Sequence, residues 1–346
     1  MNQPSGPDLR RPFFHRPHVV LIGAGASRQA FPSGDRNGRL LPLMRDLVEV
    51  LGLGPSLDHA GIHFLHDDFE ALYSHITAST HHSALAREIE SAVFDYFAAM
   101  NLPDEPTLYD HLVLSLRPKD VIASFNWDPF LMQAFDRNRD FAPLPRLLFL
   151  HGNVAVGHCF SHSPSTMGPV NTICARCNRP FQPSRLLYPV VNKDYSADQN
   201  IRVAWDLLGK FLKDAYVLTI FGYSAPKTDV VAKSMLLRAW GPGIARNYEQ
   251  IEIIDVLDED CLRRTWSDFI HTHHFDTYPI TGPGYQNFYD SWVARHPRRS
   301  CEAVWDQTME IKYLPLRAYP KYANWDALYN WYAALIQQEV HPLEPL

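Results

Sequence analysis

Three polar side chains with chemistry to offer, Asn126, Asp128 and His151, follow two short apolar runs, "DVIAS" and "RLLFL". An imidazole with its ordinary pKa near 6.5 accepts a proton from a hydroxyl or a water near neutral pH. The amide of Asn126 can orient hydroxyls or water by hydrogen bonds, and Asp128 suits the local turn. We therefore predict Asn126 and His151 as catalytic residues, with Asp128 beside them. The structural alternatives are a turn-forming Asn126 and a hydrogen-bonded core histidine at position 151.

A glycine-rich stretch, "GAGAS" (residues 23–27), follows the apolar run "HVVLI". Glycine lets the backbone approach a ligand closely, so a short buried strand followed by such a turn is typical of a nucleotide site. The pattern is weak by itself, because turns between a strand and a helix also favour glycine without any ligand.

Two further apolar runs end in polar residues. "YVLTIF" is followed by Gly222 and then by Ser224, and "QIEIID" ends in Asp255. Ligands of open parallel sheets bind beyond the carboxyl ends of the strands. We therefore expect these residues to share one sheet edge with the glycine stretch, Asn126 and His151. For Asp255, the alternative is the N-cap of a helix.

The chain contains five cysteines, an odd number for a disulfide framework, and three of them lie close together in the sequence. Cys159 with His162, and Cys174 with Cys177, form two pairs at the spacing of a zinc knuckle. They predict a structural zinc site with three thiolates and one imidazole. His158 is the rival of His162 as the fourth ligand. The alternative is a module that packs without metal and keeps its thiols free.

Strand-like and helix-like segments alternate along the chain, which predicts a doubly wound, Rossmann-like α/β fold with a mostly parallel sheet. Five apolar runs predict its strands, and patterns such as "LLPLMRDLVEVLG" (residues 40–52) predict covering helices. We expect one domain over residues 1–280, with a helical insertion at about 38–116 and a small Cys/His module at about 152–195. Residues 281–346 are expected to form a helical and irregular extension packed on that domain.

The formal charge of −6 over 346 residues disfavours a generally basic nucleic-acid surface, although the stretch "RHPRR" (residues 295–299) is locally basic. The sequence does not begin with the apolar segment of a signal peptide, and no window approaches the roughly eighteen apolar residues that span a bilayer. We therefore expect a cytoplasmic protein that does not act at a membrane.

Four motifs in order resemble those of the sirtuins, and more closely those of a bacterial sirtuin-like branch of NAD-consuming antiphage defence proteins. They are "GAGAS", "SFNWD" (residues 124–128), "LFLHGN" (residues 148–153) and "FGYS" (residues 221–224), within about residues 19–255. The resemblance implies NAD+ as the bound nucleotide, with Asn126 and Asp128 at the nicotinamide ribose and His151 as the catalytic histidine. The residues predicted at the cofactor are Gly23, Ala24, Gly25 and Ser27 at the pyrophosphate, Gly222 and Ser224 at the adenosine half, and Asp255. In sirtuins a zinc ribbon follows the catalytic histidine at a similar distance, usually with four cysteines.

Three segments depart from the sirtuins that remove acyl groups from proteins. Phe125 stands where they carry Gln, "AFPSGDRNG" stands where they carry "IPDFR", and "YPVVNKDY" lacks the apolar-aromatic pattern that pairs with an acyl-lysine peptide. We therefore expect water as the nucleophile, and hence an NAD+ glycohydrolase that releases nicotinamide and ADP-ribose. The alternatives are an NAD-dependent protein-lysine deacylase and a non-catalytic nucleotide-binding subunit of a complex.

An NAD+ hydrolase that is always active would deplete the NAD+ of its own cell, so its activity needs gating. No segment of the sequence has the features of a sensor domain. By physical argument and by analogy with the antiphage proteins, we expect a homo-oligomer that acts as the NAD-depleting effector of a bacterial antiphage defence system. A second component, such as a motor ATPase or a nucleic-acid sensor, would provide the trigger.

Overall fold

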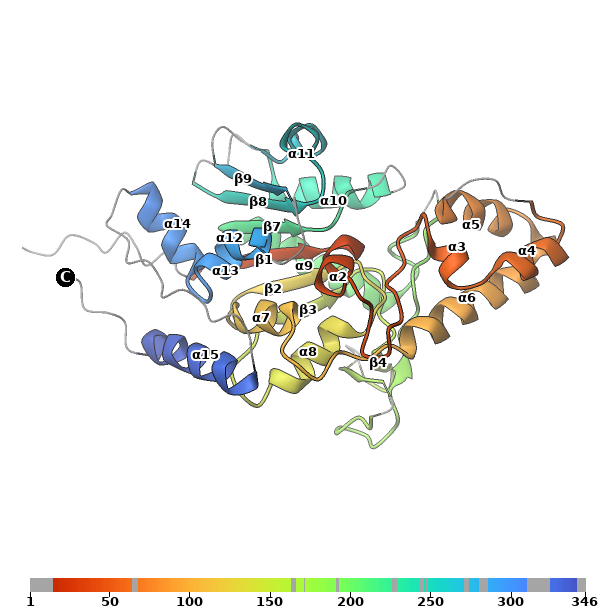
Figure 1. Ribbon diagram of the computed structural model, residues 1–346, viewed down its shortest axis with the longest axis horizontal. Coiled ribbons are helices and arrows are strands. Elements are labelled where there is room, and N and C mark those ends of the chain that lie inside the picture. The colour runs from red at the N-terminus through yellow and green to blue at the C-terminus, as the bar shows by residue number, and fades with distance from the viewer. Residues whose placement is uncertain are drawn as a thin grey trace, which may run out of the picture.

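A parallel sheet of six strands forms the centre of the molecule (Figure 1). The structure is a computed structural model that describes residues 15–63, 68–162, 166–170, 172–190, 193–225, 229–242, 246, 248–270, 274–279, 286–309 and 324–340. The strands are β1 (His18–Ile22), β2 (Val121–Ser124), β3 (Arg146–Phe149), β7 (Val217–Phe221), β8 (Gln250–Asp255) and β9 (Phe275–Pro279). Their order is β3-β2-β1-β7-β8-β9, and every neighbouring pair is parallel. This topology confirms the predicted fold class.

The first strand shows why the apolar runs become central strands. Val19 and Leu21 belong to one apolar cluster, and Val20 and Ile22 belong to another. Successive side chains of a strand point to opposite faces, so a continuous apolar run suits a sheet that is covered on both sides. One cluster includes residues of α9 (Gln199–Asp214), α10 (Val230–Trp240) and α11 (Glu259–Trp266), and the other includes residues of α2 (Ala24–Ala30), α7 (Leu108–Leu114) and α8 (Phe130–Asn138).

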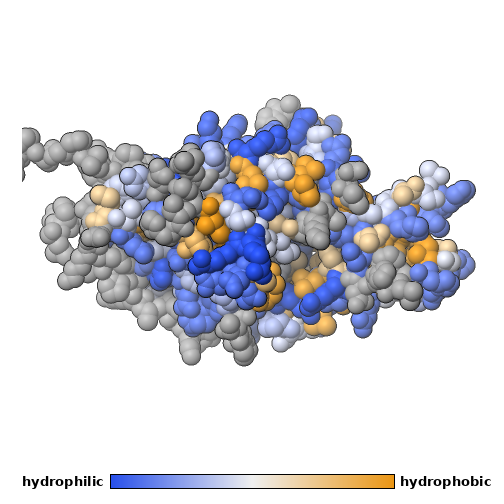
Figure 2. Space-filling view, turned by 90° about the horizontal axis from the view of Figure 1, so that it is seen from above, coloured by the Kyte–Doolittle hydropathy of each residue, from blue (hydrophilic) through white to orange (hydrophobic). Residues whose placement is uncertain are grey.

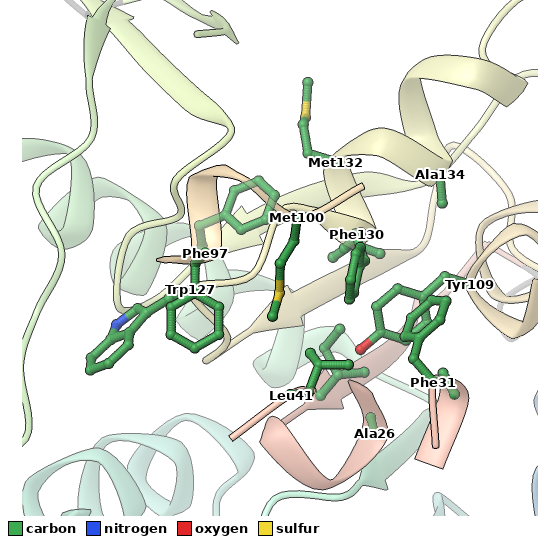
Figure 3. Packing of buried hydrophobic residues seen from close by; sticks show 14 of the residues in the cluster. Ala26, Phe31, Leu41, Phe97, Met100, Tyr109, Trp127, Phe130, Met132 and Ala134 are labelled. Carbon is green, nitrogen blue, oxygen red and sulfur yellow. The ribbon is translucent and has the colours of Figure 1, made fainter. Parts of the chain in front are cut away.

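The second cluster fixes α2 against the neighbouring helices (Figure 3). Phe31, which follows α2, packs against Phe130 of α8 with ring centroids 4.4 Å apart. The same ring meets Tyr109 of α7 edge-on at 5.6 Å. Interiors packed to this density hold their side chains in single positions. The stretch after β1 is therefore held firmly relative to α7 and α8.

Among the described residues, the interval predicted as a helical insertion begins with four short helices and one helix of 16 residues. These are α3 (Leu47–Val50), α4 (Gly54–His59), α5 (Phe69–Thr77), the 3-10 helix η1 (Thr80–His82) and α6 (Ser83–Ala98). In Figure 1 they form an arm beyond one end of the sheet, whereas α7 lies back beside it. The helix predicted over residues 40–52 is confirmed only for Leu47–Val50 and is wrong for 40–46 and 51–52. Pro42 has no N–H for a helix, and Asp46 accepts a hydrogen bond from Leu43 N that forms a turn instead.

The predicted Cys/His module contains a small antiparallel sheet. Its strands are β4 (Val156–Cys159), β5 (Thr166–Pro169) and β6 (Gln182–Pro183), in the order β5-β4-β6. Residues 163–165, 171 and 191–192 of the module lie outside the described residues.

The edge strand β9 is a strand that the sequence analysis missed. All its residues are half-buried, and its sequence "FDTYP" mixes polar with aromatic side chains. No apolar run marks it, because an edge strand has less surface to bury. The next elements are α12 (Gln286–Asp290), α13 (Trp292–Arg295), α14 (Ser300–Thr308) and α15 (Trp325–Val340).

One arginine of the locally basic stretch is an internal tie rather than part of a nucleic-acid surface. Arg298 is buried and forms an ion pair with Glu339 of α15. It also donates to Leu114 O and Leu116 O at the end of α7. Arg298 therefore holds the C-terminal helix against the end of α7.

The outer surface is mixed. Figure 2 shows a face on which hydrophilic residues surround small, separate apolar groups. Within the described parts of the chain, no helix is long and apolar enough to cross a bilayer.

Candidate active site

A pocket of about 650 Å³ lies at the carboxyl edge of the sheet, at the point where the strand order changes direction. From β1 the order runs to β2 and β3 on one side and to β7, β8 and β9 on the other. Ligands of doubly wound sheets bind at such a switch point, and small-molecule pockets have volumes of about 300–1,000 Å³. The residues that were predicted at the catalytic centre or at the cofactor all line this pocket: Gly23, Ala24, Gly25, Ser27, Asn126, Asp128, His151, Gly222, Ser224 and Asp255.

The glycines after β1 lie where two backbone segments touch. Gly23 N–H donates to Phe221 O, and Gly25 N–H donates to Gly222 O, each at 3.0 Å. A Cβ on Gly25 would stand 2.9 Å from Gly222 O. A Cβ on Gly222, whose φ is +61°, would stand 2.1 Å from Ala26 N. The packing of the two loops therefore requires these glycines, whether or not a ligand binds there.

A buried hydrogen-bond network joins α2 to the loop after β2. Asn126 Nδ2 donates to Gly23 O and to Ser27 Oγ, each at 2.9 Å. Ser27 Oγ donates to Asp128 Oδ2 at 2.7 Å and lies 2.6 Å from the hydroxyl of Tyr109. Asn126 Oδ1 makes no hydrogen bond with any residue that the structure describes. The amide is therefore held by its nitrogen, and its oxygen is a free acceptor at the pocket wall.

The loop that carries Asn126 is held in turn by the loop that carries His151. Asn153 Nδ2 donates to Asp128 O at 2.6 Å and to Asn126 O at 3.3 Å. Val154 N–H donates to Trp127 O at 3.0 Å. The two motifs after β2 and β3 thus form one hydrogen-bonded unit.

Asp128 is buried, and both of its carboxylate oxygens accept hydrogen bonds within the protein. One accepts from Ser27 Oγ and the other from Phe130 N at 3.2 Å. Loss of water around the charged form raises the pKa of Asp128 to about 6. This position suits a residue that holds the turn rather than one that contacts a ligand with a free oxygen.

His151 is also buried at the pocket wall, and burial changes its expected pKa. Burial disfavours the imidazolium and lowers the pKa of His151 to about 3. The sequence-based expectation of an ordinary pKa is therefore wrong, and His151 is neutral at physiological pH. Phe125 meets the imidazole edge-on at 5.0 Å and stacks on Tyr223 at 3.9 Å.

Four side chains near His151 were missed by the sequence analysis. Lys193 and Asp229 form an ion pair whose side chains are only 3% and 4% exposed. Tyr223 donates to Asp229 Oδ2 at 3.1 Å, and Tyr195 lies beside His151. Lys193 and Asp229 are 36 residues apart, so no local pattern pairs them. The available signal was their place beside motifs already singled out, within "YPVVNKDY" and shortly after "FGYS".

Asp255 is the last residue of β8. It lies on the opposite side of the pocket from β3, the strand that precedes His151. Its Oδ1 accepts from Val256 N at 2.7 Å and from Leu257 N at 3.2 Å. Burial raises the pKa of its carboxyl. The alternative role as a helix N-cap is wrong, because Asp258 caps α11 by accepting from Cys261 N.

The arm formed by α3 to α6 supplies an apolar part of the pocket wall. The apolar residues that line the pocket from the arm and from the segment before it are Leu41, Pro42, Leu43, Met44, Leu47 and Phe97. Trp127, Leu187 and Pro189 add further apolar surface from the loops after β2 and β6. The pocket therefore offers an apolar side as well as the polar edge of the sheet.

The predicted metal ligands come together at the end of β4. The ligand atoms of Cys159, His162, Cys174 and Cys177 all lie within 4.8 Å of one another. Cys159 Sγ lies 3.4 Å from Cys177 Sγ, and Cys174 Sγ lies 3.5 Å from His162 Nε2. Three thiols and an imidazole at this separation fit a tetrahedral zinc ion with Zn–S near 2.3 Å and Zn–N near 2.0 Å. The donor set is therefore compatible with a structural zinc, which would stabilise the module without supplying a reacting group.

The structure also separates the two candidate histidines. His158 precedes Cys159 in β4, and adjacent residues of a strand point to opposite faces. His162 is the histidine that joins the three cysteines. The turn between Cys174 and Cys177 is closed by Asn178 N–H, which donates to Cys174 O at 2.8 Å with Asn178 at φ +56°.

No protein family model matches the chain, and no curated protein matches it. Among solved structures, the chain is similar to a structure that concerns the mechanism and regulation of Sir2 enzymes. The identity is 14%, the match covers 86% of this chain and 96% of that chain, and the TM-score is 0.41. A Sir2 homologue mutant with ADP-ribose (13% identity, 89% and 100% covered, TM-score 0.37) and a Sir2 homologue with NAD (13%, 89% and 97%, 0.33) are also similar. These likenesses are distant, so the roles proposed below depend on the residues of this chain.

Proposed function

We propose that this protein is an NAD+ glycohydrolase that releases nicotinamide and ADP-ribose. The observation that carries the proposal is that Asn126 and His151 share one pocket with the glycine turns at residues 23–25 and 222–224. Doubly wound sheets bind dinucleotides at this switch point. A neutral imidazole and an amide oxygen beside it can act on the ribose that carries nicotinamide.

In the proposed reaction, the bond between ribose C1′ and the nicotinamide nitrogen breaks. The electron pair of that bond moves to the pyridinium ring, and neutral nicotinamide leaves without being protonated. Water adds to C1′ and loses one proton, which His151 accepts and passes to solvent. One NAD+ and one water thus give nicotinamide, ADP-ribose and one proton.

The main task of the protein in this reaction is positioning. Asn126 Oδ1 accepts a hydrogen bond from a ribose hydroxyl or from the attacking water, because its Nδ2 is already engaged by Gly23 and Ser27. Because its pKa is about 3, His151 is unprotonated at neutral pH. The unprotonated imidazole is the form that accepts a proton. Asp128 holds the loop that carries Asn126.

The remaining polar residues suit the other half of the dinucleotide. The backbone of residues 23–25 and 222–224 lies against the pyrophosphate and the adenosine half. The second carboxylate oxygen of Asp255, which has no partner among the described residues, accepts from the adenosine ribose, as carboxylates at strand ends do in dinucleotide sites.

Water is proposed as the acceptor because three segments differ here from those of deacylating sirtuins, and one of them, "YPVVNKDY", lacks the pattern that pairs with an acyl-lysine peptide. Phe125 replaces their Gln and packs between Tyr223 and His151. The proposal also includes a cellular role as the NAD-depleting effector of an antiphage system. Uncontrolled turnover would harm the host, so we propose a cytoplasmic homo-oligomer gated by a second component such as a motor ATPase or a nucleic-acid sensor.

Incubation of the purified protein with NAD+ alone tests the proposed activity. We expect nicotinamide and ADP-ribose in equal amounts, and His151→Ala should lower the rate by about 10²–10⁴-fold, the usual effect of losing a positioned base. Light scattering tests the oligomer. A strict monomer that is fully active alone would contradict the gated oligomer.

The alternatives give different products in the same assay. Nicotinamide release that requires an acyl-lysine peptide would indicate a deacylase. NAD+ binding without turnover, both alone and with a candidate partner, would indicate a non-catalytic subunit. Full activity in His151→Ala would place the chemistry elsewhere.

A further inference from the structure

Three side chains near His151 converge on a single carboxylate, that of Asp229. Lys193 Nζ and the Tyr195 hydroxyl, at 3.5 Å, both donate to Asp229 Oδ1. The Tyr223 hydroxyl donates to Asp229 Oδ2 at 3.1 Å. All four side chains are buried. One carboxylate thus collects three donors at the wall of the pocket.

The Tyr195 hydroxyl also lies 3.4 Å from His151 Nε2. A tyrosine hydroxyl has one proton to donate, and a carboxylate can only accept when ionised. The proton of Tyr195 therefore goes to Asp229, and the oxygen of Tyr195 is left as the acceptor. It can be bonded to His151 only if His151 Nε2 carries the hydrogen.

The other ring nitrogen is then the basic one. A neutral imidazole has one N–H and one lone pair, so a hydrogen on Nε2 places the lone pair on Nδ1. His151 Nδ1 makes no hydrogen bond to any part of the chain that the structure describes. His151 lines the pocket, so this lone pair is available to a ligand there.

We propose that Tyr195 and Asp229 are positioning residues that hold His151 in the Nε2–H tautomer and leave Nδ1 as its proton acceptor. This inference rests on the proposed NAD+ hydrolysis only for its kinetic consequence. In that reaction a water O–H bond breaks as the water oxygen bonds to C1′, and the released proton moves to Nδ1. The imidazolium then donates a hydrogen bond from Nε2 to the Tyr195 oxygen, and the Tyr195 hydroxyl donates a hydrogen bond to the charged Asp229.

Lys193 and Tyr223 support this tautomer indirectly, by holding Asp229 in place. Their hydrogen bonds fix both oxygens of Asp229, so the carboxylate cannot rotate away from Tyr195. The ring of Tyr195 is fixed separately, because it packs edge-on against Trp205 at 4.9 Å. The hydroxyl of Tyr195 can therefore be removed while its ring stays in place.

The kinetic test uses Tyr195→Phe in the full-length chain, with Tyr332→Phe as the matched control. Tyr332 is also a buried tyrosine whose hydroxyl contacts a histidine, His111, but it lies on α15, outside the pocket. We expect Tyr195→Phe to lower kcat by about 10–100-fold and to change KM for NAD+ by less than about threefold. Tyr332→Phe should leave both constants unchanged, even if its melting temperature falls. Equal effects of the two variants on kcat would contradict the proposal.

A second readout does not depend on activity. Nitrogen-15 NMR of histidine-labelled protein distinguishes the two tautomers, with the His151 signals assigned by their loss in His151→Gln. We expect the Nε2–H form in the wild type and a shift towards the Nδ1–H form, or a mixture, in Tyr195→Phe. An Nδ1–H form in the wild type, or an unchanged tautomer in Tyr195→Phe, would overturn the proposal. If the wild type releases no nicotinamide, the proposed function fails while this spectrum still decides the tautomer.

Discussion

The side-chain amide of Asn126 donates to Ser27 Oγ across 2.9 Å and so ties the loop after β2 to the first turns of α2. The same nitrogen donates to Gly23 O. Asn126 therefore has two separable parts, a nitrogen that joins two loops and an oxygen that is left for the pocket. Its replacement should change both stability and turnover.

We expect Asn126→Ala to lower nicotinamide release at saturating NAD+ by at least about 10²-fold, because the water or ribose hydroxyl loses its acceptor. Gly23 O and Ser27 Oγ lose a donor as well, and a buried group left unpaired costs about 1–3 kcal/mol. Urea denaturation and kcat, measured on the same preparation, check both parts. Ser27→Ala removes one of the two hydrogen bonds of the Asn126 nitrogen but keeps the amide oxygen, so it should lose stability with less loss of activity. Equal loss of kcat in the two variants would show that Asn126 acts only through the loop.

Gly25→Val should reduce stability even without any ligand. The new Cβ would stand 2.9 Å from Gly222 O and 3.0 Å from Gly222 Cα, and backbone atoms at this contact cannot rotate away. Overpacking of this kind costs about 1–3 kcal/mol. Gly54→Ala is the control, because a Cβ there meets nothing within 4 Å. Thermal melting in the absence of NAD+ decides the point, and a Gly25→Val protein as stable as wild type would show that the two loops can separate.

The sequence predicted those parts of the fold that local apolar pattern determines. β1 is the continuous, fully buried run "HVVLI". Because both faces of the sheet are covered, burial itself produces the apolar pattern that marks the strand. β9 was missed because its half-buried residues at the sheet edge include polar ones. The failed helix over residues 40–46 shows the opposite limit, where Pro42 and the turn between Leu43 and Asp46 override an apolar spacing of helical type.

The candidate site was predictable where a motif directly follows a strand. Asn126, His151 and Asp255 could be placed at one edge because parallel strands bring their carboxyl ends together. The pairing of Lys193 with Asp229, and the contact of Tyr195 with His151, arise only when separate loops pack together. The low pKa of His151 could not be predicted from the sequence for the same reason, since burial is a property of the folded chain.

The raised pKa of Asp128 predicts a pH-dependent contribution to stability. Its folded-state value of about 6 exceeds the ordinary 3.8, so the folded protein holds this proton more tightly than the unfolded chain. The contribution is therefore present at low pH and is lost as pH rises from about 4 through about 6, by up to about 3 kcal/mol. Asp128→Asn removes the titration.

Denaturation of wild type and Asp128→Asn between pH 4.5 and 7.5 checks this contribution. The free energy of unfolding of the variant, minus that of wild type, should increase as pH rises. This difference should become constant above about pH 7. The comparison cancels the titration of other buried groups, including His151. A difference that stays constant with pH would contradict the burial argument for Asp128.

The cysteine cluster should hold one zinc ion per chain, and its loss should affect folding rather than chemistry. We expect elemental analysis of protein purified without chelators to find zinc, and Cys174→Ala to lose it. The variant should melt at a lower temperature and be cleaved more readily within residues 156–183, because a closed site contributes folding free energy. Cys261→Ala is the control, because Cys261 lies on α11 outside the cluster. Zinc-free wild-type protein with an unchanged melting temperature would remove the prediction.

We expect Asp255 to determine the preference of the protein for NAD+ over its 2′-phosphorylated form, NADP+. Its Oδ1 is engaged by the backbone of Val256 and Leu257, so we propose that the other oxygen contacts the adenosine ribose. A carboxylate there accepts from a ribose hydroxyl and repels a 2′-phosphate, so wild type should favour NAD+ over NADP+. Asp255→Asn keeps an oxygen for Val256 N and removes the charge, and it should raise the ratio of kcat/KM for NADP+ to that for NAD+ by about tenfold, which corresponds to about 1.4 kcal/mol. The ratio measured for the two dinucleotides in both proteins checks this, and an unchanged ratio would mean that the adenosine ribose lies away from the end of β8.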